Sequence, residues 1–146
     1  GDKEKARETL EEVAANNDTD PVIFNNIGLM YAENGNSEKA EENYKRALEI
    51  DNTYNEARLN LVASILRGER EIIEEMNGLG MSKKDSERYD ELDKKRKELY
   101  KEVVPYLETA IEIEPNNMDA VKTAMNIYSN LGNEAKVEEM KAKLAQ

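Results

Sequence analysis

The stretch PVIFNNIGLMYAENGNSEKAEENYKRALEIDNTY, residues 21–54, contains two amphipathic segments separated by a short polar turn. One face of the first segment has residues at the helical spacing i, i+3, i+4 and i+7. These residues are Phe24, Ile27, Gly28 and Tyr31. The second segment has an apolar stripe at helical spacing, made of Ala40, Tyr44, Ala47 and Leu48. The pattern therefore predicts two helices joined as a hairpin.

The residues between the two segments are typical of a turn. Glu33 is followed by Asn-Gly-Asn, and Asn and Gly interrupt helices because they favour turn conformations. Asn36 or Ser37 can cap the second helix with its side-chain oxygen. Asp51 and Asn52 are expected to end that helix.

Gly28 lies inside the apolar face of the first helix, where it costs about 1 kcal/mol of helix propensity relative to Ala. A Gly at this place indicates that another helix crosses closely over its backbone. Ala40 and Ala47 are small enough to allow this approach, and Tyr44 would fill the space between them.

The spacing of these residues over 34 positions resembles the tetratricopeptide repeat. Phe24 stands where the family usually has Trp, and Asn52 stands where it usually has Pro. The resemblance implies an all-α fold, a right-handed solenoid of antiparallel helix pairs. It also implies a scaffold that binds proteins.

The same spacing continues on both sides, so we expect one tetratricopeptide domain over residues 1–146. Residues 1–20 match the second helix of a partial repeat. Residues 55–117 match a repeat with an elongated hairpin. Residues 118–146 match a C-terminal repeat, offset by 97 from the first complete one, in which Met140 replaces the aromatic residue expected at Lys141.

The elongated hairpin contains an insertion at about residues 69–97. The equivalent positions Ala47 and Ala110 are 63 residues apart, which is 29 more than one period. The segment NGLGM, residues 77–81, predicts the tip, and Ser82 with Asp85 resembles a capping box. Each arm would extend about 17 Å at 1.5 Å per residue. The arm is either a spacer or a docking surface, and Pro105 should bend the helix at its base.

Composition excludes several classes of function. The net charge is −11, whereas proteins that bind nucleic acids need a basic surface. The absence of His and Cys removes thiolate nucleophiles, Ser-His triads, disulfides and the usual zinc ligands. No apolar run is long enough to span a membrane. The chain begins with Gly1, which suggests a processed form or a fragment.

Candidate catalytic and metal sites are weak. Adjacent carboxylates such as Glu11-Glu12 and Glu74-Glu75 lie in charged runs, whereas a general acid needs an apolar pocket to raise its pKa. Residues 16–20 are rich in oxygen ligands but lack the Gly and the distal Glu of a calcium loop. We therefore predict no enzyme activity, no cofactor and no metal site.

In the family, the first helices of the repeats line a concave groove. The resemblance places a peptide groove here at Val22, Asn25, Leu29, Leu59, Asn60, Ala63, Leu66, Lys122 and Asn126. Several of these are apolar, so we expect apolar contacts with polar selection by the Asn side chains. The basic clamp that some relatives use to bind a chaperone's C-terminal carboxylates is absent, because only Asn60 agrees with it. The alternative is that the preceding or lengthened helices cover these residues.

The leading hypothesis is a non-catalytic scaffold that binds a peptide or helix of a protein partner, with no nucleic acid and no membrane insertion. The alternative is a self-assembly module that forms a homo-oligomer through half-repeat ends or through the long hairpin. The long insertion also resembles that of exported bacterial repeat proteins. The resemblance implies a periplasmic or otherwise exported location, with a cytoplasmic location as the alternative.

Overall fold

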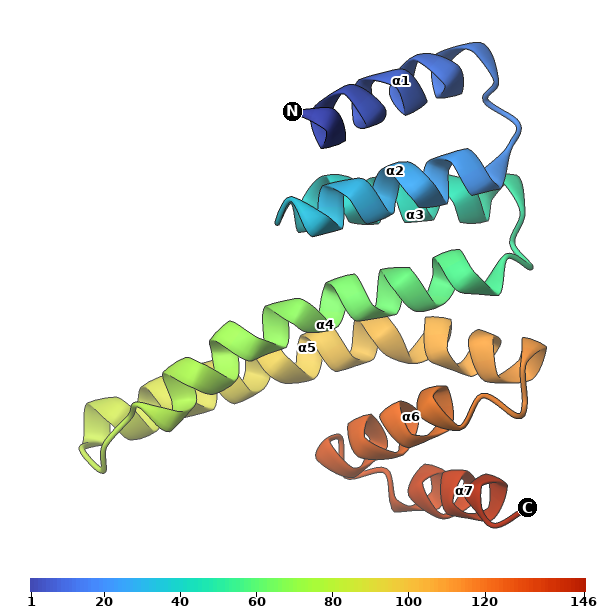
Figure 1. The fold of residues 1–146 in the computed structure, drawn as a ribbon. Coiled ribbons are helices and arrows are strands. Elements are labelled where there is room, and N and C mark those ends of the chain that lie inside the picture. The colour runs from blue at the N-terminus through green and yellow to red at the C-terminus, as the bar shows by residue number, and fades with distance from the viewer. The chain divides into compact units, whose positions relative to one another are not determined.

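The computed structural model describes all 146 residues and contains seven α-helices and no strand (Figure 1). This confirms the all-α class expected from the sequence. The helices are α1 (Asp2–Asn16), α2 (Pro21–Glu33), α3 (Ser37–Ile50), α4 (Asn55–Asn77), α5 (Lys83–Ile113), α6 (Met118–Asn130) and α7 (Glu134–Leu144).

The helices form two compact units, Gly1–Ser64 and Ile65–Gln146, and the boundary between them falls within α4. In the first unit, the core consists of small, aliphatic and aromatic side chains from its helices, including Ala14, Ile27, Tyr31, Ala40, Tyr44, Ala47 and Leu61. In the second unit, it includes Leu92, Tyr100, Val103, Leu107, Ala110, Val121, Ala124, Tyr128 and Met140. The single-domain assignment from the sequence stays a prediction.

The pairing of α2 with α3 confirms the reason for a glycine at position 28. A Cβ added to Gly28 would lie 2.5 Å from Cε1 of Tyr44 and 3.1 Å from the carbonyl oxygen of Ala40. Tyr44 is almost fully buried, so its ring cannot move into solvent. The two helices therefore approach as closely as the glycine backbone permits.

The turn between α2 and α3 recurs between α6 and α7. Gly35 and Gly132 are the two glycines with positive φ, at 78° and 72°, a conformation that a Cβ disfavours. One residue later in each turn, the side chain of Asn36 or Asn133 accepts a hydrogen bond from the backbone of the next helix. Asn36, rather than Ser37, is thus the cap of α3.

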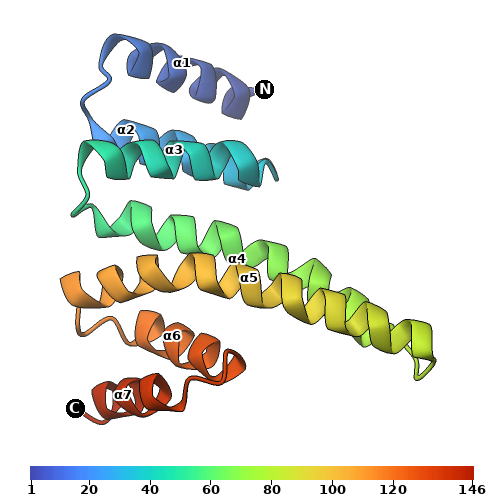
Figure 2. The same ribbon diagram turned by 180° about the vertical axis from the view of Figure 1, so that it is seen from behind.

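The long hairpin is formed by the end of α4 and by α5, which lie side by side out to the tip (Figures 1 and 2). The helices contain 23 and 31 residues, against 11–15 in the others. Ser82 and Asp85 form the expected capping box at the start of α5. Met76 and Leu92 are buried within the hairpin, and Pro105 lies inside α5 as expected.

Three positions of the repeat pattern hold residues that need separate comment. Arg58, at the position of Phe24 in the preceding repeat, is buried and donates hydrogen bonds to the Asn52 carbonyl and the Asn55 side chain. It thereby ties the start of α4 to the turn before it. Tyr89 begins the apolar side of α5 but is 47% exposed, because it lies towards the tip, where little packs against it. Met140 is buried, which confirms that it replaces the aromatic residue.

Candidate functional site

Asn25 lies between Val22 and Leu29 in the part of the predicted groove that belongs to the first unit. Its amide donates to Oε1 of Glu56 at 3.1 Å, and its carbonyl oxygen accepts from the Asn60 amide at 2.9 Å. Both partners lie in α4, so Asn25 links α2 to the first half of α4. The sequence led us to expect that Asn25 helps to select a ligand, and that role stays a prediction. Its side chain is fully buried by the partners that satisfy it.

Apolar side chains lie exposed on the same face of α2. Val22 and Leu29 are three residues before and four residues after Asn25, and they are 47% and 36% exposed. On α4, Leu59 and Asn60 are half-buried and Ala63 is exposed. The first unit therefore presents an exposed apolar edge on α2 beside a fixed polar link to α4.

The other predicted groove residues belong to the second unit. Leu66 is half-buried on α4, and Lys122 and Asn126 are exposed on α6. Neither Lys122 nor Asn126 forms a salt bridge or a side-chain hydrogen bond to another helix. The assignment of all nine residues to one binding groove stays a prediction.

A set of three residues occurs once in each unit and links three consecutive helices. In the first unit, the Tyr31 hydroxyl donates to Glu11, and the Lys39 ammonium lies 5.1 Å from the centre of the Tyr31 ring. These residues come from α2, α1 and α3. An ammonium over the face of an aromatic ring is attracted by the ring quadrupole, so each pair stabilises the packing of neighbouring helices.

The second unit repeats this arrangement 97 residues later. The Tyr128 hydroxyl of α6 donates to Glu108 of α5 at 2.5 Å, and Lys136 of α7 lies 6.0 Å from the ring centre. The offset of 97 between the two repeats relates Tyr31 to Tyr128, but the flanking charges were not predicted. The same offset, applied to the Glu and the Lys, could have found them.

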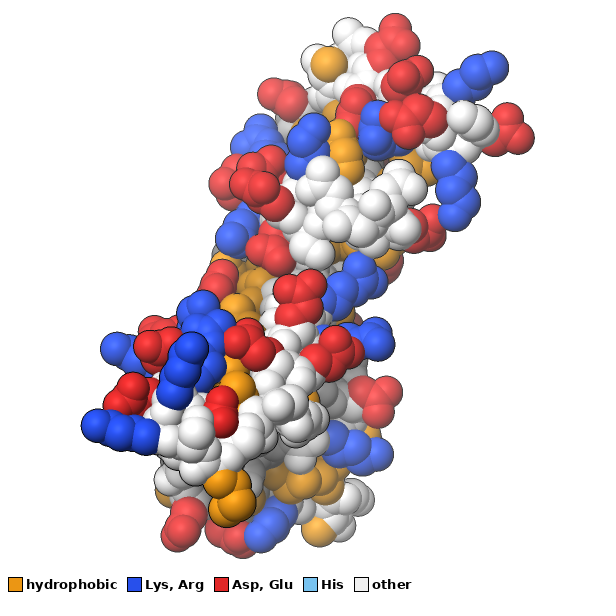
Figure 3. All heavy atoms as spheres, turned by 90° about the vertical axis from the view of Figure 1, so that its left-hand side faces the viewer, with side chains coloured by type: hydrophobic (Ala, Val, Ile, Leu, Met, Phe, Trp, Pro, Cys, Tyr) orange, Lys and Arg blue, Asp and Glu red, His pale blue; other side chains and the backbone are white.

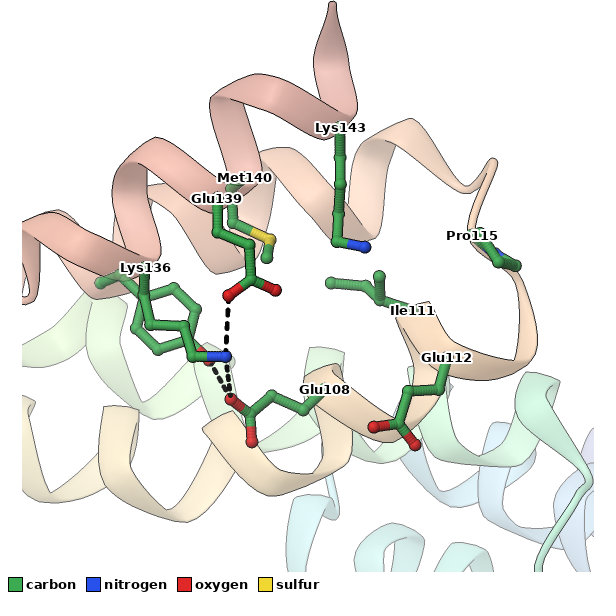
Figure 4. Close-up of a pocket in the computed structure, with 9 residues that line it drawn as sticks. Glu108, Ile111, Glu112, Pro115, Lys136, Glu139, Met140 and Lys143 are labelled. Atoms are coloured by element: carbon green, nitrogen blue, oxygen red, sulfur yellow. Dashed lines mark hydrogen bonds and ion pairs between the residues drawn. The ribbon is translucent and has the colours of Figure 1, made fainter. Parts of the chain in front are cut away.

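In the second unit, this cluster lines a half-enclosed cavity of about 240 Å³ between α5, α6 and α7. Lys136 forms ion pairs with Glu108 at 3.4 Å and with Glu139 at 3.0 Å, and Lys143 extends from α7 towards Ile111 (Figure 4). The cavity is smaller than the roughly 300–1,000 Å³ typical of ligand pockets. The ion pair of Lys136 with Glu108 joins α7 to α5, which fits a role of this cluster in packing.

The tyrosines of these clusters have shifted pKa values. Burial, with the hydrogen bond to Glu108 as the second cause, raises the pKa of Tyr128 above its usual value. The hydrogen bond to Glu11 raises the pKa of Tyr31. Both shifts favour the neutral phenol, which acts as a hydrogen-bond donor to a carboxylate, so neither tyrosine is prepared to act as a base.

No group of three or more Asp or Glu side chains is placed to hold a metal ion. No helix is both long and apolar enough to cross a bilayer. Charged side chains of both signs are interspersed on the face in Figure 3, with small hydrophobic areas between them.

Comparison with protein families gives one match, in which residues 21–54 match the tetratricopeptide repeat model. The chain is also similar in fold to a monomeric mutant of IFIT1 solved with Gppp-AAAA, with a TM-score of 0.68 and 23% identity. A thermophilic TPR protein of Thermus thermophilus has a TM-score of 0.62 and 17% identity. No curated protein sequence matches the chain.

These likenesses cover 97% and 98% of this chain, but only 29% of the IFIT1 chain and 65% of the Thermus chain. At identities of 23% and 17%, these similarities establish the fold. They do not show that this chain binds the same partners as those proteins. Residues 21–54 therefore form a tetratricopeptide repeat, and the chain as a whole has the all-α fold of the tetratricopeptide-like solenoid class.

Proposed function

We propose that this protein is a non-catalytic scaffold that binds an extended peptide or a helix of a protein partner. The observation that carries the proposal is the exposed apolar edge of α2 in the first unit. Val22 and Leu29 present apolar surface to solvent on either side of Asn25, whose position is fixed by two hydrogen bonds. Preformed apolar surface next to fixed polar groups suits peptide recognition, because little has to be ordered on binding.

The apolar edge consists of Val22 and Leu29 on α2, with Leu59 and Ala63 of α4 as the adjoining contacts. Burial of these side chains would contribute about 25 cal/mol per Å² of apolar surface removed from water. Asn60 is half-buried, and its amide already donates to Asn25 between Val22 and Leu29 on α2. Asn25 itself acts by holding the two helices together rather than by touching the ligand.

The test begins with selection of peptides from a phage-displayed random library on the immobilised chain. Isothermal titration of a selected peptide then compares the wild type with Leu29→Glu and Val22→Glu. We expect each substitution to weaken binding by at least about tenfold, which corresponds to about 1.4 kcal/mol. The matched control is Val13→Glu, which places the same charge on a 42% exposed valine of α1.

Two results would overturn the proposal. One is a selected peptide that binds Leu29→Glu and Val22→Glu as tightly as the wild type. The other is a loss of affinity in Val13→Glu equal to that in the two edge variants, because a general effect of negative charge would then explain both. Circular dichroism of each variant establishes that the helices are intact.

A further inference from the structure

An open depression lies on the side of the long hairpin, within the second unit. It is lined by Gly68 and Ile72 of α4 and by Lys95, Glu98, Leu99, Lys101 and Glu102 of α5. We name this surface the hairpin patch. It is separate from the apolar edge of α2 and from the cavity in Figure 4, since it shares no residue with either.

The floor of the hairpin patch is apolar and flat. Gly68 has no side chain, and a Cβ placed there would be 3.6 Å from Cδ1 of Leu99. Ile72 and Leu99 are half-buried, so part of each side chain faces the depression. A partner can therefore come close to the α4 backbone at Gly68 and contact two aliphatic side chains.

The charges around this floor sum to zero. Lys101 pairs with Glu98 at 3.1 Å. Lys95 and Glu102 are both exposed, and neither forms a salt bridge within the chain, although Lys95 lies close enough to Glu75 to lower the pKa of that carboxyl. The hairpin patch thus has an unpaired cation at one end and an unpaired anion at the other.

The spacing of these two charges allows the patch to match itself. Residues 95 and 102 are seven positions apart, which is two helical turns and about 10.5 Å along one face of α5. If a second α5 lies antiparallel on the first, Lys95 of each helix faces Glu102 of the other. Both ion pairs then form in one symmetric contact, as in any isologous two-fold interface.

We propose that the hairpin patch is a docking surface for a second copy of this chain, arranged antiparallel about a two-fold axis. Leu99 and Ile72 pack across the axis over the bare backbone of Gly68, and two Lys95–Glu102 pairs flank them. A second copy fits because the patch is neutral. The chain as a whole has a net charge of −11, so two copies repel each other overall, and a neutral, self-complementary patch is where they can meet. The patch is small, so the dimer is weak and reversible.

The experiment is sedimentation velocity of the full chain from roughly 10 µM to 1 mM. Dimers held by a small, weak interface become populated in this concentration range. The wild type is expected to move from monomer to dimer over this range. Lys95→Glu and Glu102→Lys each create two like-charge contacts in the dimer. Each should therefore weaken association by at least about tenfold.

Two further samples test the pairing itself. The double variant K95E/E102K exchanges the charges and should associate like the wild type. An equimolar mixture of the two single variants should form a heterodimer more readily than either variant forms a homodimer, because only the mixture places opposite charges together at both ends. Lys94→Glu is the matched control, since it alters an exposed charge one residue away and outside the patch.

Gly68→Gln tests the floor independently of charge. Its side chain projects into the depression and should prevent docking, while the ordinary contact distance to Leu99 leaves the fold intact. A wild type that stays monomeric at about 1 mM overturns the proposal. So does a double variant or a mixture of single variants that fails to associate while the wild type dimerises. Peptide binding at the α2 edge is measured separately, so failure here leaves the proposed scaffold function standing.

Discussion

The ring of Tyr44 lies against the backbone of Gly28, where a methyl group on the glycine would come within 2.5 Å of the ring. Tyr44 is 1% exposed and belongs to α3, whereas Gly28 is in the middle of α2. The two residues are 16 positions apart, and together they set how closely the two helices of the repeat approach. Substitutions at either position should therefore change the stability of the first unit.

Gly28→Ala is expected to destabilise the protein although Ala is the better helix former by about 1 kcal/mol. The new methyl group would displace the buried Tyr44 ring, and overpacking of this kind costs about 1–3 kcal/mol. Urea unfolding measures the change. Gly68→Ala is the matched control, because its methyl group would have only an ordinary contact with Leu99. It should stabilise the protein, and equal effects of the two substitutions would contradict the argument.

Tyr44→Ala should lower the free energy of unfolding by about 3 kcal/mol or more, as is typical of aromatic truncations in a core. The substitution leaves a cavity between α2 and α3. Tyr89→Ala removes the same atoms from a side chain that is 47% exposed and should cost far less. Denaturant unfolding followed by circular dichroism compares them. A loss near zero for Tyr44→Ala would mean that the packing of α2 on α3 does not depend on the ring.

Tyr128→Phe is expected to change how stability depends on alkaline pH. The pKa of the Tyr128 phenol is raised in the folded state. The stability that this group contributes is therefore fully present below the pKa of about 10 that it has in the unfolded chain, and it is lost as pH rises further. Near neutral pH, the variant should be less stable by about 1 kcal/mol, because the hydrogen bond to Glu108 is missing. This difference should shrink above pH of about 10.

The measurement for Tyr128→Phe is urea unfolding in buffers on either side of that pH. Tyr89→Phe serves as the control, since the Tyr89 hydroxyl has no hydrogen bond within the chain and its removal should be neutral. If the stability difference between wild type and Tyr128→Phe stays constant through the alkaline range, the phenol is not coupled to folding in the way described.

Replacing the arm of the long hairpin by a short turn should leave a folded helical protein. The arm's buried residues, Met76 and Leu92, pack within the hairpin, and repeat stability comes mainly from nearest neighbours. The structure moves the start of the segment to be replaced, which the sequence placed at about residues 69–97. Glu69 accepts a hydrogen bond from the buried Tyr100 hydroxyl, so the replacement should start after it.

Circular dichroism and thermal melting test the shortened chain. We expect the helical signal per residue to be retained and the transition to stay cooperative. Loss of the folded state would mean that the remaining helices depend on contacts made by the arm. In a chain that does fold, the loss of Lys95 should also remove self-association, which sedimentation velocity would detect.

Sequence periodicity alone determined the class of this fold and most of its core. The spacing around Gly28 and Tyr44 predicted the close crossing of α2 and α3, because only a residue without Cβ fits beneath an aromatic ring. The capping box at Ser82 and the buried Met140 were also predicted correctly. These features are local or depend on one period, so the order of residue types is enough to specify them.

Tertiary structure decided what the polar side chains do. Asn25 lies on the expected face of α2, yet it is buried, because Glu56 and Asn60 reach it from α4. The sequence placed Tyr31 on the apolar face of its helix, but the carboxylate partners of Tyr31 and Tyr128 are 20 residues earlier in the chain. A periodic pattern shows which way a side chain points. Whether it meets solvent or a hydrogen-bond partner depends on the neighbouring helix, and only the folded chain supplies that helix.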